Sequence, residues 1–67
     1  MEQGTIVRIN YERGYGFISR GEGVPELFFH YTEVIDKDIK DLREGDKVVF
    51  EVGEGPKGPN ALQVKLA

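Results

Sequence analysis

Apolar and polar residues alternate along five short segments of this chain, with the two-residue period of a β-strand that buries one face. The segments are residues 5–10, 15–20, 26–31, 46–52 and 61–66. In the last two, the apolar residues that share one side are Val48, Phe50 and Val52, and then Leu62, Val64 and Leu66. The pattern therefore predicts five strands and no long helix.

Runs rich in Gly, Pro and Asn at residues 10–14, 20–25 and 53–60 predict turns between these strands. Residues 32–35 predict one helical turn capped by Thr32, and residues 36–46 a connecting loop that Ile39 and Leu42 anchor in the core. Five short strands with tight turns favour an antiparallel sheet closed into a small barrel, because closure removes exposed edges. The predicted fold is all-β.

The length of 67 residues predicts a single domain over residues 1–67, in which every core position matters. The chain has no cysteine, so it has no disulfide and no thiolate metal site, which fits a reducing compartment. Residues 1–10 lack the pattern of a secretory signal, and no apolar run is long enough to span a membrane. We expect a soluble, cytoplasmic protein without a metal or cofactor.

The charge balance opposes a nucleic-acid partner at long range, because the net charge is -3 and the pI is near 5.0. The distribution of charge along the chain makes this argument against a nucleic-acid partner weaker. Residues 1–20 hold three arginines against two glutamates, a net of +1, whereas residues 21–67 hold six basic and ten acidic groups, a net of -4. The aromatic-rich half is thus the more basic half, although three arginines in twenty residues are also typical of an ordinary solvated surface.

Side-chain alternation predicts which aromatic rings face outward. If Ile18, Leu27 and Phe29 form the core, the residues on the outer face are Tyr15, Phe17, Phe28 and His30. The reverse assignment would bury Ser19 and Glu26 with His30, at about 1 to 3 kcal/mol for each unpaired polar group. One or two rings, Tyr15 first, could instead pack under a loop, and Tyr31 at the strand end fits either face.

Exposed aromatic rings beside arginines are typical of surfaces that stack the bases of single-stranded nucleic acid. An enzyme is not expected, because the chain has one His, no Cys and carboxylates mainly in charge-mixed loops. Its glycine-rich runs match neither a dinucleotide-binding nor a phosphate-binding loop. The alternative is a protein-binding module, since small barrels with exposed aromatics also bind proline-rich peptides.

Two motifs carry a resemblance to a known family. "GYGFI" at residues 14–18 and "LFFHY" at residues 27–31 resemble the two ribonucleoprotein motifs of bacterial cold shock proteins, and "LREGDKVVFEV" and "GPNALQV" resemble later runs of that family. The resemblance implies a five-stranded Greek-key barrel of the OB type. It also implies a monomer that binds single-stranded RNA and DNA, acts as an RNA chaperone and influences transcription and translation.

The resemblance also implies particular contacts. Its stacking residues are Tyr15, Phe17, Phe28, His30 and Tyr31, and Arg13 and Lys57 would contact the strand from flanking loops. Where the family has a Trp-Phe pair this chain has Arg8 and Ile9, and Ile39 replaces a loop aromatic. Arg8 can still stack its guanidinium on a base and pair with a phosphate. Simple alternation places Arg8 on the side of Ile6, unless a bulge near Gly4 turns it toward the rings.

Overall fold

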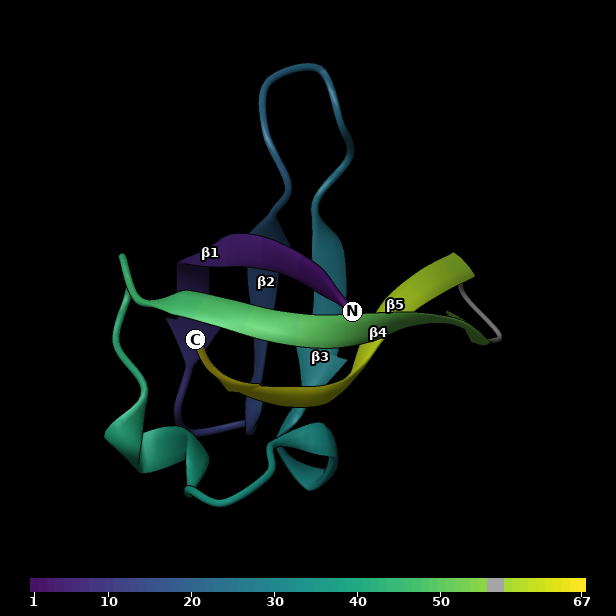
Figure 1. The fold of residues 1–67 in the computed structure, drawn as a ribbon. Coiled ribbons are helices and arrows are strands. Elements are labelled where there is room, and N and C mark those ends of the chain that lie inside the picture. Colours follow the sequence, from purple (N-terminus) through teal and green to yellow (C-terminus); the bar gives the residue numbers. More distant parts are fainter. Residues whose placement is uncertain (56–57) are drawn as a thin grey trace.

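Five strands form a closed barrel in the computed structural model, which describes residues 1–55 and 58–67 (Figure 1). They are β1 (Glu2–Asn10), β2 (Tyr15–Ser19), β3 (Leu27–His30), β4 (Lys47–Gly55) and β5 (Gly58–Leu66). Their order around the barrel is β1-β2-β3-β5-β4, and the neighbours are antiparallel apart from β3 and β5. The prediction of an all-β, five-stranded barrel is confirmed, with one parallel contact at the point where the barrel closes.

The barrel interior is filled by apolar side chains from all five strands and from the loop before β4. The buried residues are Ile6, Ile18, Leu27, Phe29, Ile39, Leu42, Val48, Phe50, Ala61 and Val64. Ile18, Leu27 and Phe29 are therefore inside, as predicted. Phe29 lies so close to β2 that a Cβ atom at Gly16 would lie 2.7 Å from its ring, so only glycine fits there.

The alternation is interrupted in β1 and in β5, and the predicted face of β5 was wrong. The pairing register shifts between Ile6 and Arg8 in β1. A second shift, between the pairs Val49–Lys65 and Glu51–Leu62, leaves one extra residue in β5. Val52 of β4 still shares the side of Phe50 and pairs with the buried Ala61, although it is itself 40% exposed. In β5, Gln63 has a positive φ of 52°, and Ala61 and Val64 fill the core in place of Leu62 and Leu66. Bulges of this kind redirect every later side chain.

The predicted turn at residues 53–60 is shorter than expected, because the ladder between β4 and β5 continues to the pair Gly55 and Gly58. Gly and Pro are poor strand formers in general, but the cross-strand pairing of a long hairpin overrides that weak preference. This hairpin extends beyond the barrel wall in Figure 1.

Two 3-10 turns lie in the segment between β3 and β4, η1 (Tyr31–Glu33) and η2 (Ile39–Asp41). The predicted cap at Thr32 was wrong: β3 ends at His30, whose Nδ1 accepts a hydrogen bond from the Thr32 N–H and caps η1. Ile39 and Leu42 are buried anchors, as predicted. In the part of the chain that the structure describes, no helix has the length and apolar character needed to cross a membrane.

Candidate nucleic-acid interface

Three aromatic rings form a cluster on the outer face of β2 and β3. Tyr15 and Phe17 come from β2 and Phe28 from β3, and each pair of ring centroids is separated by 5.6 to 6.0 Å. The antiparallel register explains this, because Phe17 is the direct partner of Phe28 and Tyr15 that of His30. We call Tyr15, Phe17 and Phe28 the aromatic cluster.

The cluster is accessible from solvent. Phe28 is 37% exposed, while Tyr15 and Phe17 are half-buried. None of the three belongs to the core, whose residues alternate with them along the same strands. The outward direction of these rings, predicted from the alternation, is confirmed.

His30 and Tyr31 form a second ring pair beside the cluster. Their ring centroids lie 4.5 Å apart, and Tyr31 is 53% exposed at the start of η1, so it belongs to neither face of β3. Gly14 positions Tyr31, because the Gly14 carbonyl accepts a hydrogen bond from the Tyr31 N–H at 2.8 Å. Gly14 has a φ of 76°, and a Cβ there would lie 2.6 Å from the tyrosine ring. Glycine is thus required on both counts.

Arg8 lies beside the aromatic cluster. A bulge near Gly4 was the condition expected for this position, and the structure has the register shift farther along the strand, between Ile6 and Arg8. As a result Ile6 is buried while Arg8 is exposed and is the direct partner of Phe17. Cross-strand partners project from the same face of a sheet. The outer row therefore runs Arg8, Phe17, Phe28 across three strands.

The same row continues onto β5, at a residue that the sequence analysis missed. Asn60 is the parallel partner of Phe28 and lines a groove of about 790 Å³. The groove is lined by Tyr15, Phe17, Pro25, Glu26, Phe28, Gly55, Gly58, Pro59 and Asn60. The turn signal in residues 53–60 could have placed Asn60 near a strand end, but not beside Phe28.

The remaining predicted contact residues are arranged around this surface. Arg13 is exposed in the turn between β1 and β2, where its N–H donates to Asn10 Oδ1 at 3.0 Å, and Lys57 lies outside the described residues. Ile39 is only 8% exposed and Ile9 packs against the core, so neither offers a flat apolar surface in place of the missing rings. Residues 1–55 and 58–67 hold no group of acidic or His side chains suited to a metal ion.

Comparison with known proteins agrees with this geometry. The family model described as the 'Cold-shock' DNA-binding domain matches residues 2–67. A probable cold shock protein A of Mycolicibacterium smegmatis is 46% identical over 65 residues, 97% of each chain, and the cold shock protein ScoF of Streptomyces coelicolor is 39% identical over the full length of both. Among solved structures, Drosophila Unr CSD456 superposes with a TM-score of 0.80 at 35% identity, over 98% of this chain and 26% of that one.

Proposed function

Because the chain belongs to the 'Cold-shock' DNA-binding domain family, we propose that it binds single-stranded RNA and DNA by stacking bases on the aromatic cluster. The observation that carries this proposal is the arrangement of three rings, within 6.0 Å of one another, on the outer face of two paired strands. Each unpaired base has a flat π-face that such rings can contact, whatever its sequence.

The other contacts follow from position. His30 and Tyr31 extend the stacking surface toward η1, and Arg8 contacts the strand from β1, beside Phe17. Arg13 and Lys57 pair with phosphates from the flanking turns. A strand held in this way keeps its bases from pairing, so the protein acts as an RNA chaperone that influences transcription and translation. A cytoplasmic monomer formed by one domain over residues 1–67 is part of the same proposal.

A protein-binding module is the second candidate, because the groove beside Phe28 is lined mainly by apolar and proline residues. A labelled thymidine heptamer and a labelled proline-rich peptide, each titrated with the protein, distinguish the two. The proposed function requires binding of the heptamer. Saturable binding of the peptide alone would favour the module. The descriptions of the family and of these relatives name no catalytic activity.

Affinity should depend only weakly on salt. The net charge of -3 and the few cations near the rings leave few phosphate contacts, so stacking supplies most of the binding free energy. We expect the logarithm of affinity for the heptamer to fall with the logarithm of salt concentration by a slope equivalent to about two or three released ions. Fluorescence anisotropy at several salt concentrations measures it. A slope equivalent to six or more ions would show that phosphate contacts dominate instead.

Replacing Arg8 tests its place beside Phe17. Arg8→Trp adds a broad ring at a position that faces the strand, so binding of a thymine-rich strand at high salt should tighten by up to about 1 to 2 kcal/mol. At low salt the gain should shrink, because the lost charge costs one phosphate contact. Arg8→Gln, which loses the charge without adding a ring, is the control. Unchanged affinity of Arg8→Trp at both salt concentrations would mean that residue 8 does not touch the strand.

A further inference from the structure

A polar, basic depression lies on the outer face of the barrel next to the aromatic cluster. It has a volume of about 300 Å³ and is lined by Gln3, Gly4, Thr5, Ser19, Arg20, Gly21 and Lys47. Thr5 of β1 is the direct partner of both Ser19 in β2 and Lys47 in β4. The chain neighbours Ile6, Ile18 and Val48 are all buried, so these three side chains project outward together.

This row of three residues runs directly alongside the row that holds the rings. Ser19 follows Phe17 by two residues on the same face of β2, a separation of roughly 6 to 7 Å along the strand. The rings of the aromatic cluster and of the His30–Tyr31 pair come from β2, β3 and η1. On the adjoining part of the outer face, β1 contributes Arg8 and Thr5, and β4 contributes Lys47. The outer face therefore carries aromatic side chains on β3 and β2, and cationic and hydroxyl side chains farther on, on β1 and β4.

The chemistry of the row fits a phosphate group. The Lys47 ammonium is exposed and has three donors, and the Thr5 hydroxyl can donate a further hydrogen bond. The Ser19 Oγ already accepts a hydrogen bond from the Gly21 N–H at 3.3 Å, which leaves its own hydrogen free to donate outward. Three convergent donors, one of them charged, match the oxygens of a phosphate and offer little to an uncharged base edge.

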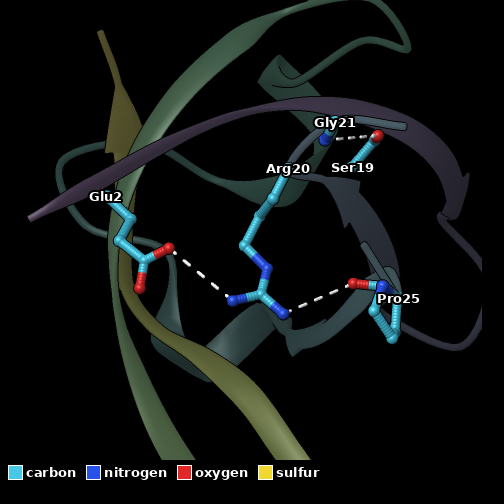
Figure 2. Close-up of polar contacts among 5 residues, drawn as sticks. All are labelled: Glu2, Ser19, Arg20, Gly21 and Pro25. Carbon is cyan, nitrogen blue, oxygen red and sulfur yellow. Dashed lines mark hydrogen bonds and ion pairs between the residues drawn. The ribbon is translucent and has the colours of Figure 1, made fainter. Parts of the chain in front are cut away.

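Two carboxylates near the depression, those of Glu2 and Asp46, have partners other than Lys47. Figure 2 shows the Arg20 guanidinium directed toward Glu2, 3.6 Å away, and toward the Pro25 carbonyl, and away from Ser19. Glu2 is thus occupied by Arg20, and it alternates with Gln3, which lines the depression. The Asp46 carboxylate accepts a hydrogen bond from the Arg43 N–H at 2.9 Å. Neither carboxylate is therefore paired with Lys47, whose side chain is exposed.

We propose that Thr5, Ser19 and Lys47 form a phosphate-binding subsite that extends the aromatic cluster onto β1 and β4. It holds the phosphate next to the base stacked on Phe17, either a diester within a longer strand or a terminal monoester on a short one. The subsite rests on the proposed function, because without stacked bases nothing brings a strand to this face. The two parts of the interface then bind different parts of the nucleic acid: β2 and β3 contact its bases, and β1 and β4 contact its phosphate backbone.

The test uses the full chain and four DNA probes: a thymidine tetramer without a terminal phosphate, the same tetramer with a 5′ or a 3′ phosphate, and a hexamer. One of the two phosphorylated tetramers should bind roughly three- to tenfold more tightly than the plain one. The gain from the terminal phosphate should vanish in Lys47→Gln, together with about one released ion in the salt dependence. If the diester of a longer strand also reaches the subsite, Lys47→Gln should weaken binding of the hexamer as well, although its additional bases still stack.

Lys37→Gln is the matched control, because it removes the same charge from the loop between η1 and η2. Figure 1 shows this segment at the opposite end of the barrel from the loop that follows β2. Lys37→Gln should leave the gain intact, whereas Thr5→Val combined with Ser19→Ala should reduce it, and thermal melts confirm that the variants are folded. A gain from the terminal phosphate that persists in Lys47→Gln, or that Lys37→Gln reduces equally, would overturn the subsite. So would the absence of any gain from either phosphate together with unchanged hexamer binding in Lys47→Gln. If the plain tetramer and the hexamer both fail to bind, the proposed function itself fails.

Discussion

Phe29→Ala is expected to lower the free energy of unfolding by about 2 to 5 kcal/mol, the largest effect that we predict for this chain. The Phe29 side chain is 0% exposed, and its ring packs directly on Gly16 of the neighbouring strand. Truncation leaves a cavity that the closed barrel cannot fill by collapse. A domain of 67 residues has about 3 to 10 kcal/mol of stability in total, so the variant loses a large share of it.

Urea and thermal unfolding followed by circular dichroism measure this loss. The melting temperature should fall by at least about 8 °C. Ile18→Ala, also fully buried, should behave similarly, while Val24→Ala, 40% exposed in the loop after β2, should change stability by less than about 0.5 kcal/mol. Equal melting of Phe29→Ala and Val24→Ala would contradict the assignment of the inner face.

Phe28→Ala and Phe17→Ala should do the opposite, each weakening single-strand binding by about 1 to 3 kcal/mol while the protein stays folded. Both rings lie outside the core, and Phe28 is 37% exposed, so their removal takes away stacking surface and leaves the barrel interior intact. The two losses should not add fully, because the ring centroids are 5.9 Å apart and each ring orients the other. Titration of a labelled heptamer with each variant gives the values.

Phe28→Leu separates stacking from general apolar contact. Leucine keeps most of the apolar surface but has no π-face, so binding of nucleic acid should fall almost as far as in Phe28→Ala. A groove that binds peptides through apolar contact would tolerate leucine much better. Wild-type affinity in both Phe28 variants would remove the aromatic cluster from the interface.

The faces of β2 and β3 were predictable from the sequence because their pairing is regular. From Tyr15 to Ile18 each residue meets its partner in β3 without a register shift, so the period of two holds and places Phe17 and Phe28 outside. In β1 and β5 the alternation is interrupted by an extra residue, and in β5 Gln63 has a positive φ, which no local pattern signals. Arg8 and Leu62 consequently face differently from a simple count along the strand.

In the candidate interface, the aromatic rings could be predicted from the sequence, but the residues contributed by more distant strands could not. Its rings come from two strands adjacent in sequence, joined by one short loop, so alternation brings them together. Asn60, in contrast, reaches Phe28 only through the parallel contact that closes the barrel, between residues 32 positions apart. The row of Thr5, Ser19 and Lys47 likewise depends on β1 pairing with β4, a strand distant in the chain, as well as with β2. Such non-local neighbours appear only once the topology is known.

The most direct test of the central claim, that the aromatic cluster binds unpaired bases, compares a labelled thymidine heptamer with the same heptamer in a duplex, at moderate salt. In a duplex the base faces are stacked on one another and out of reach of Phe17 and Phe28, whereas in a single strand they are free. We predict that the single strand binds at least about tenfold more tightly than the duplex, since two stacked bases contribute at least about 2 kcal/mol and a tenfold change requires only about 1.4 kcal/mol. Equal affinity for both forms, or no binding of the single strand, would contradict the account.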